Sequence, residues 1–151
     1  MKKIFSLFLL CAIVSVGFAQ KVKIKDGIAT VDEQPTLKWE KGAAGEINIS
    51  GINSTTQEIF ATYLSYNDPG KITNSNPEGK VRYIELNFLT LGKKCEIDNR
   101  LQSALVKFLL ENKVYVDSVF NAENAELVIT KYGTRYTENR PANVHIYVHE
   151  D

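Results

Sequence analysis

The chain has 151 residues, with 18 basic and 18 acidic side chains, and its formal net charge at neutral pH is zero. This balance argues against nucleic acid as a partner, since nucleic-acid binding depends on a basic surface. It also argues against a polybasic membrane-binding surface.

Residues 1–19 have the organisation of a cleavable signal peptide. Lys2 and Lys3 precede an apolar run that closes with Gly17-Phe18-Ala19, which supplies the small residues that signal peptidase requires. The run is shorter than the ~20 residues that span a bilayer. We therefore expect cleavage before Gln20, no membrane span in the mature chain, and a periplasmic or secreted location.

Residues 20–151 are expected to fold as one α+β domain with its own core. Cys11 leaves with the signal peptide, so Cys95 is the single thiol of the mature chain. One cysteine cannot form an intrachain disulfide, and the fold must be held by burial and backbone hydrogen bonds.

The first half of the mature chain has the two-residue periodicity of β-strands. Asp26-Gly27 is a strong hairpin signal, because both positions tolerate a positive φ. Residues 57–66 are apolar on both faces, as expected of a strand covered on both sides. Residues 67–79 are rich in Pro, Gly and Asn and predict a surface loop, the best candidate for mobility. The pattern predicts an antiparallel meander with strands at 21–25, 28–31, 36–40, 46–50, 57–66 and 81–89.

The periodicity then changes to that of amphipathic helices. Asp98 is the expected N-cap of a first helix, whose apolar stripe would comprise Leu101, Ala104, Leu105, Phe108 and Leu109. A second helix is expected between Asn121 and Gly133, and a last strand at 144–148. The predicted fold is α+β, an antiparallel meander of about five to seven strands with two C-terminal helices packed on one face.

The chain resembles the uncharacterised small exported proteins of Gram-negative bacteria, over most of its mature length. The resemblance implies bacterial export and a β-meander followed by two helices. It implies no activity and assigns no site residue. It rests on Gln20 at the mature end and on the segments Lys25-Asp26-Gly27, Tyr83-Ile84-Glu85-Leu86-Asn87-Phe88 and Lys131-Tyr132-Gly133.

Residues 145–151 hold both histidines, His145 and His149, followed by Glu150 and Asp151, and all four are ligand types for zinc or copper. On a strand the two histidines would share a face about 13 Å apart, at roughly 3.3 Å per residue. Two nitrogens must each approach one zinc ion to about 2.1 Å, so the pair cannot chelate it together. We therefore interpret His145, Tyr147 and His149 as the solvated face of an edge strand.

Cys95 is a candidate nucleophile, with a histidine as its base. Lys93 and Lys94 would help to lower the pKa of its thiol. Against this role, no oxyanion motif surrounds Cys95, and it lies at the expected strand-to-helix junction, where a small apolar residue is useful. The sequence contains no P-loop, dinucleotide-binding, nucleophile-elbow or zinc-protease motif. We predict no catalytic residue, no cofactor and no metal ligand.

These observations favour a non-catalytic exported module that binds a protein, an envelope component or a small ligand. Its expected contact surfaces are the 67–79 loop and the sheet face without helices. The alternatives are an exported metal-binding protein or hydrolase that uses His145, His149 and Cys95, and a structural envelope protein that self-associates. An enzyme would gather His or Cys with acids in a concave pocket, whereas a binding module would present an open patch.

Overall fold

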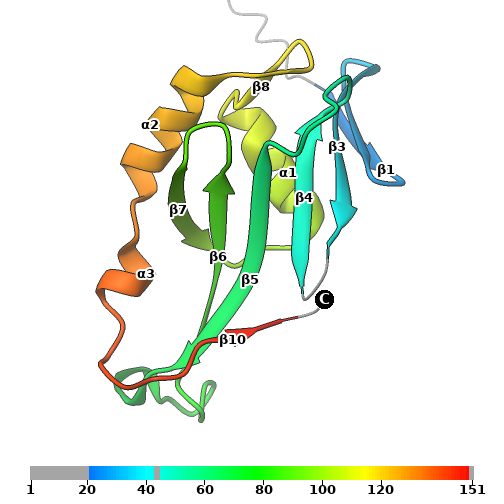
Figure 1. Cartoon of the computed structure of the whole chain (residues 1–151). Helices are drawn as coiled ribbons and strands as arrows, with labels where there is room; N and C mark the ends of the chain where they lie inside the picture. Colours follow the sequence, from blue (N-terminus) through cyan, green and yellow to red (C-terminus); the bar gives the residue numbers. More distant parts are fainter. Residues whose placement is uncertain (1–20, 43–44, 150–151) are drawn as a thin grey trace, which may run out of the picture.

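An antiparallel meander of seven strands forms the framework of the protein, and each strand pairs with the next one in the chain (Figure 1). The computed structural model describes residues 21–42 and 45–149, so the predicted signal peptide lies outside the described residues. The predicted α+β meander is confirmed. The strands are β1 (Val22–Lys25), β2 (Ile28–Val31), β3 (Gln34–Lys41), β4 (Glu46–Gly51), β5 (Ile59–Asn67), β6 (Lys80–Phe88) and β7 (Lys93–Asp98).

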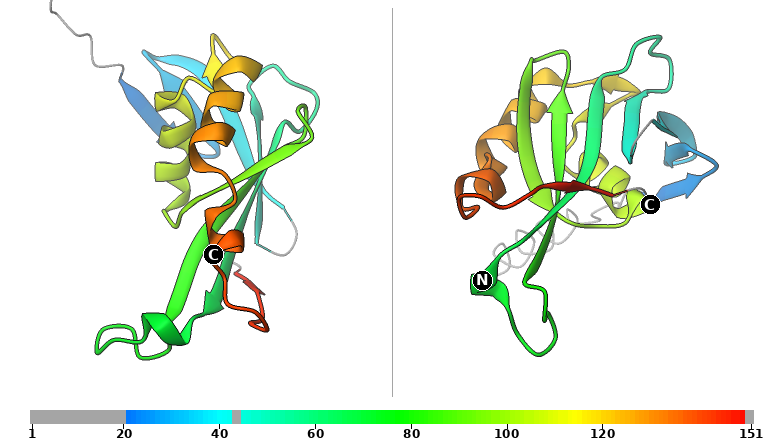
Figure 2. Two further views of the ribbon diagram at one scale, coloured as in Figure 1. Left: turned by 90° about the vertical axis from the view of Figure 1, so that its left-hand side faces the viewer. Right: turned by 60° about the horizontal axis from the view of Figure 1, so that its bottom comes forward.

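Two helices, α1 (Gln102–Glu111) and α2 (Ala122–Tyr132), cover one face of the sheet, which we call the inner face. In Figure 1, α1 lies behind the strands and α2 runs along β7; in the left view of Figure 2, both helices lie to one side of the sheet. Phe108 of α1 and Tyr132 of α2 meet edge to face, with ring centroids 5.4 Å apart. The helices and the sheet bury one main cluster, whose strand members include Ala29, Leu37, Ile49, Ala61, Ile84, Leu86, Cys95 and Ile97.

The predicted limits of the second helix are confirmed, and both ends are capped. The side-chain oxygen of Asn121 accepts the backbone N–H of Asn124 at 2.9 Å, and Gly133 ends the helix with a positive φ of 55°. None of the helices in the described part of the chain has both the length and the apolar character needed to cross a bilayer.

The predicted start of the first helix is wrong. Asp98 is the last residue of β7, and α1 begins four residues later, at Gln102. Residues 93–98 form a strand that pairs with β6, in which Cys95 lies opposite Leu86. Leu101, expected in the buried stripe, takes the N-cap position and remains 77% exposed.

A short hairpin that the periodicity did not predict connects the two helices. Its strands are β8 (Tyr115–Val116) and β9 (Val119–Phe120), and it packs beside β3 and β4. The Ser118 hydroxyl donates to the Pro35 carbonyl oxygen at 2.9 Å. A Cβ atom on Gly51 would lie only 2.3 Å from the Ser118 carbonyl oxygen, so the hairpin requires glycine there.

The β5–β6 pair extends beyond the rest of the sheet as a two-stranded ribbon (Figure 1). Close to the helices, the inner face of this ribbon belongs to the main cluster through Tyr63 and Ile84. Farther along, a second cluster lies on the opposite, outer face and contains Leu64, Tyr66 and Tyr83. Strand β5 is therefore buried on both faces, as its sequence predicted.

Residues 134–149, which we call the C-terminal strap, cover this second cluster. The strap contains a four-residue helix, α3 (Arg135–Glu138), and ends in β10 (Tyr147–Val148), which pairs antiparallel with Ser65 and Leu64 of β5. Tyr136 of α3 stacks on Tyr83 with ring centroids 4.8 Å apart. The last strand is shorter than the predicted 144–148 segment, and the strap crosses the ribbon in both Figure 1 and Figure 2.

Two acidic side chains on the outer face of β7 anchor the strap. Glu96 is fully buried and accepts the backbone N–H groups of Tyr136 at 2.7 Å and Thr137 at 2.9 Å. Asp98 accepts hydrogen bonds from the Tyr136 hydroxyl and, at 2.7 Å, from the Arg135 guanidinium. The strap is thus fixed by charge-assisted hydrogen bonds in addition to apolar contact.

The loop at the tip of the ribbon is organised by hydrogen bonds. It contains a short 3-10 turn, η1 (Pro69–Lys71), next to Asp68. The Asn76 amide donates to the carbonyl oxygens of Lys71 and Lys80, both at 3.2 Å, and accepts the Lys80 N–H at 2.9 Å. The predicted surface loop therefore has an internal scaffold.

Candidate functional site

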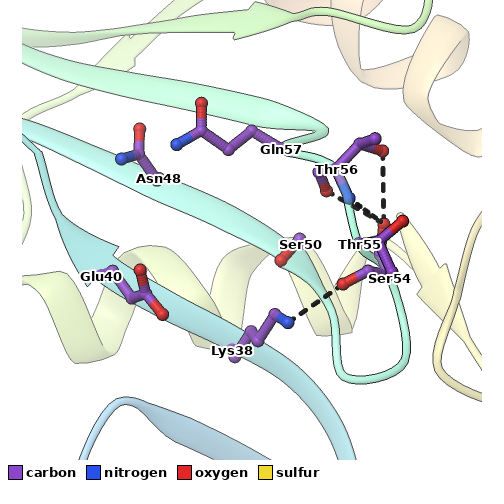
Figure 3. Close-up of a pocket in the computed structure, with 8 residues that line it drawn as sticks. All are labelled: Lys38, Glu40, Asn48, Ser50, Ser54, Thr55, Thr56 and Gln57. Atoms are coloured by element: carbon purple, nitrogen blue, oxygen red, sulfur yellow. Dashed lines mark hydrogen bonds between the residues drawn. The ribbon is translucent and has the colours of Figure 1, made fainter.

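A polar hollow of about 220 Å³ lies on the outer face of the sheet, over β3 and β4 (Figure 3). No helix covers this part of the sheet in Figure 1. The hollow combines side chains of the two strands with the loop that connects β4 to β5. Its lining residues are Lys38, Glu40, Asn48, Ser50, Ser54, Thr55, Thr56 and Gln57.

The strand register brings these side chains together. Lys38 pairs with Ser50 and Glu40 pairs with Asn48, so alternate residues of β3 and β4 share the outer face. Phe60 of β5 lies opposite Asn48 on the same face and is half-buried. The hollow therefore has polar walls, and the aromatic ring of Phe60 lies next to it on β5.

The loop that closes the hollow is fixed by its own hydrogen bonds. The Lys38 ammonium group donates to the Ser54 carbonyl oxygen at 3.0 Å. The Ser54 hydroxyl donates to the Thr56 carbonyl oxygen at 2.9 Å and accepts the Thr56 N–H at 3.3 Å. At the base of the loop, the Glu58 carboxylate accepts the Gly51 N–H at 2.7 Å. These hydrogen bonds fix the conformation of this wall of the hollow.

Several polar groups of the hollow have unused hydrogen-bonding capacity. Within residues 21–42 and 45–149, the side chains of Glu40, Asn48, Ser50 and Gln57 make no hydrogen bond or ion pair. The amide oxygen of Asn48 is buried and has no partner among these residues. Such groups normally obtain partners from protein, water or ligand, because an unsatisfied buried polar atom costs free energy. Lys38 and Glu40 carry opposite charges, so the hollow has no strong preference for a charged ligand.

The candidate nucleophile Cys95 lies on the inner face of β7, within the main cluster, and is fully buried. Burial raises the pKa of its thiol to about 12, with a smaller contribution from the neighbouring Glu96 carboxylate. Lys93 and Lys94, which the sequence suggested would lower this pKa, instead form ion pairs with Glu126 and Glu85. The thiol is therefore protonated at neutral pH.

The two histidines have different environments. His145 is exposed, whereas His149 lies beside β5, where its backbone N–H donates to the Tyr63 carbonyl oxygen at 2.9 Å. The His149 Nε2 atom lies 2.5 Å from the Ser65 hydroxyl oxygen. His149 also lines a second hollow, whose lining includes neither His145 nor Cys95. The structure therefore does not gather these three candidate residues in one hollow.

The predicted absence of a metal site stays a prediction. Among the residues whose positions are described, no group of three or more His, Cys, Asp and Glu side chains could hold a metal ion. Glu150 and Asp151, which completed the candidate ligand set in the sequence, lie outside the described residues.

The residues of the outer hollow were not predicted individually from the sequence. Polar residues at alternate positions predict only that one face of a strand is solvated. Which of them meet depends on the register of β3 against β4 and on the path of the 52–58 loop. The sequence did suggest the uncovered sheet face as a contact surface.

Comparisons with models of known protein families, with curated proteins and with solved structures found no match.

Proposed function

We propose that the protein is an exported, non-catalytic binding module that accommodates a small, uncharged, hydroxyl-rich group, such as a sugar unit, in the outer hollow. The observation that carries this proposal is the set of unpaired polar side chains facing the hollow, namely Glu40, Asn48, Ser50 and Gln57. They lie on a sheet face that no helix covers (Figure 1).

The chemistry of these side chains suits hydroxyl groups. A sugar hydroxyl both donates and accepts hydrogen bonds, and so do the side-chain amides of Asn48 and Gln57. The carboxylate of Glu40 adds a strong acceptor. Phe60 offers the apolar surface that the C–H face of a sugar ring can contact. The hollow has a volume of about 220 Å³, which is enough for one sugar unit but too small to enclose a larger ligand.

The composition of the hollow supports binding without catalysis. Among the described residues that line it, Glu40 is the only carboxylate, whereas glycoside hydrolysis generally uses a pair of carboxyl groups. No histidine or cysteine lines the hollow within the part of the chain that the structure describes. The alternative hydrolase or metal-binding protein has less support, because Cys95 is buried and protonated and is not among the described residues that line the hollow beside His149.

The binding proposal can be tested by NMR titration of the ¹⁵N-labelled mature chain with glucose, N-acetylglucosamine and their β-linked oligomers. We expect saturable shifts in the side-chain amide signals of Asn48 and Gln57. The Asn48→Ala and Gln57→Ala variants should lose the response. Asn67→Ala, an exposed change at the far end of β5, should keep it. No saturable shift with any of these sugars, or an unchanged response in both hollow variants, would refute the proposal.

The location outside the cytoplasm is proposed from the sequence of residues 1–19 alone. Expression of the full chain in a Gram-negative host, followed by fractionation and intact-mass measurement, tests it. We expect a processed chain that begins at Gln20 in the periplasm or the medium. An unprocessed chain in the cytoplasmic fraction would contradict this part of the proposal.

A further inference from the structure

The inner face of the β5–β6 ribbon is hollowed where the ribbon extends past the first turn of α1. A hollow of about 310 Å³ lies between the ribbon, the connection from β7 to α1, and the end of the C-terminal strap. It is on the opposite side of the sheet from the outer hollow. Its lining residues are Tyr63, Leu64, Arg82, Asn99, Arg100, Leu101 and His149.

The described charged side chains that line this hollow are basic. Arg82 and Arg100 contribute two guanidinium groups, and within residues 21–42 and 45–149 no aspartate or glutamate lines the hollow. Arg82 forms no ion pair or hydrogen bond through its side chain within the described part of the chain. It lies opposite Ser65 in the ribbon, on the face where Ser65 contacts the His149 ring. The guanidinium group of Arg82 is therefore available to a ligand.

Arg100 is held in position by contacts that leave most of its donors unused. Its guanidinium carbon lies 4.5 Å from the centroid of the Phe108 ring, and its Nε atom donates to the Asp98 carbonyl oxygen at 3.3 Å. The carboxylate of Asp98 is bonded to Arg135 and Tyr136 rather than to Arg100. Stacking on an aromatic ring preorganises the planar guanidinium group.

Two further features favour an anion beside these arginines. The N-cap of α1 is Leu101, which provides no side-chain hydrogen bond, so the first N–H groups of the helix lack this partner. The Asn99 side chain provides an additional amide donor at the rim. These features add to the effect of the two guanidinium groups and do not form a site without them.

We infer that this hollow binds the oxyanion group of a small organic ligand, a phosphate or a carboxylate, through Arg82 and Arg100. Guanidinium groups bind both kinds of oxyanion through paired N–H···O hydrogen bonds. The side chain of Leu101, 77% exposed at the edge of the hollow, offers apolar contact to the rest of the ligand. This inference does not depend on the proposed sugar site, because the two hollows share no residue.

The test is calorimetric titration of the mature chain at low ionic strength, with inorganic pyrophosphate in one arm and succinate in the other. We expect saturable binding of at least one anion. The anion that binds with the higher affinity identifies the ligand class, phosphate or carboxylate. Arg82→Gln and Arg100→Gln should each weaken binding about tenfold. Lys107→Gln removes one positive charge from an exposed position of α1 and should change affinity less than about twofold.

A second variant separates a binding role from a structural one. Leu101→Asp supplies the missing N-cap of α1 and places a negative charge at the hollow, so we expect a higher melting temperature together with loss of anion binding. The inference would be overturned if neither anion bound saturably. It would also be overturned if Lys107→Gln weakened binding as much as Arg82→Gln, or if Leu101→Asp bound either anion with unchanged affinity.

Discussion

Glu96 caps a helix that begins about forty residues later in the chain, because its carboxylate accepts the backbone N–H of Thr137 at 2.9 Å. The Thr137 hydroxyl and the Tyr136 N–H donate to the same carboxylate. A helix as short as α3 has little stability of its own. Its position on the outer face therefore depends on this fully buried acid of β7.

We predict that Glu96→Gln lowers the free energy of unfolding by about 1–3 kcal/mol. The substitution keeps the shape of the side chain but removes its charge and one acceptor. Urea denaturation followed by circular dichroism measures this loss, and amide exchange at Tyr136 and Thr137 should accelerate. Glu78→Gln, an exposed change in the ribbon loop, should leave both measurements unchanged within error. Equal stability of the two variants would contradict the capping role.

Asp98 should make the fold sensitive to acid. The hydrogen bond from Tyr136, with a smaller contribution from Arg135, lowers the pKa of this carboxyl in the folded state. The stabilisation is therefore present above the unfolded pKa of about 4 and is lost as the pH falls through the lower folded value. Because the side chain is 66% exposed, we expect a contribution below about 1 kcal/mol. The stability difference between wild type and Asp98→Asn should shrink from pH 6 to pH 3, and a difference that stays constant over this range would contradict the linkage.

Tyr136 should have the opposite pH dependence. Burial, together with the hydrogen bond to Asp98, raises the pKa of its phenol to about 12 in the folded state. In the unfolded chain the tyrosine has a pKa of about 10 and therefore ionises first. The stabilising contribution of Tyr136 is thus complete below pH 10 and is lost as the pH rises towards 12. The advantage of wild type over Tyr136→Phe, measured by urea denaturation, should therefore decrease across this range. A constant difference from pH 9 to pH 12 would rule out this linkage.

Cys95 should react very slowly in the folded protein. Its thiol is buried and its pKa is raised to about 12, so both access and thiolate content are low. We expect iodoacetamide at neutral pH to label the native mature chain far more slowly than the same chain in urea, as measured by intact mass. Labelling as fast as that of a free thiol would revive the nucleophile hypothesis.

Gly51 should be intolerant of any side chain. An added Cβ atom would collide with the Ser118 carbonyl oxygen, so Gly51→Ala must displace the β8–β9 hairpin. We expect Gly51→Ala to lower the free energy of unfolding, measured by urea denaturation, by about 1–3 kcal/mol. Gly92→Ala is the control for backbone strain, because Gly92 has a φ of +60° but no atom within 4 Å of the added Cβ. Gly92→Ala should lower the free energy of unfolding by about 1 kcal/mol. A smaller loss for Gly51→Ala than for Gly92→Ala would show that the collision is relieved without cost.

The sequence predicted those parts of the fold in which local periodicity and burial agree. Alternation identified the first six strands, and Asn121 and Gly133 marked the two ends of α2. Strand β7 was missed because Asp98 also fits the pattern of a helix cap. The β8–β9 hairpin was missed because its turn, Asp117-Ser118, adopts positive φ at both positions without a glycine.

The candidate sites depend on contacts between distant residues, and local patterns do not encode these. Asn48 meets Glu40 only through the register of β3 and β4. Arg82 and Arg100 share a hollow because the β7–α1 connection passes beside the ribbon. The sequence placed His145, Tyr147 and His149 on the solvated face of an edge strand, but β10 comprises only Tyr147 and Val148. The contact that places the His149 ring beside Ser65 could not be predicted.

The two hydrophobic clusters share β5 and β6 but occupy opposite faces, and only the second depends on the strap. Release of the strap would uncover Leu64 and Tyr66 and leave the main cluster intact, so we expect partial opening to precede global unfolding. The opened form would expose an unpaired apolar edge of β5, a template for strand pairing between molecules. Proteolysis within residues 134–149 should therefore convert a monodisperse preparation into one that aggregates while most of its secondary structure persists.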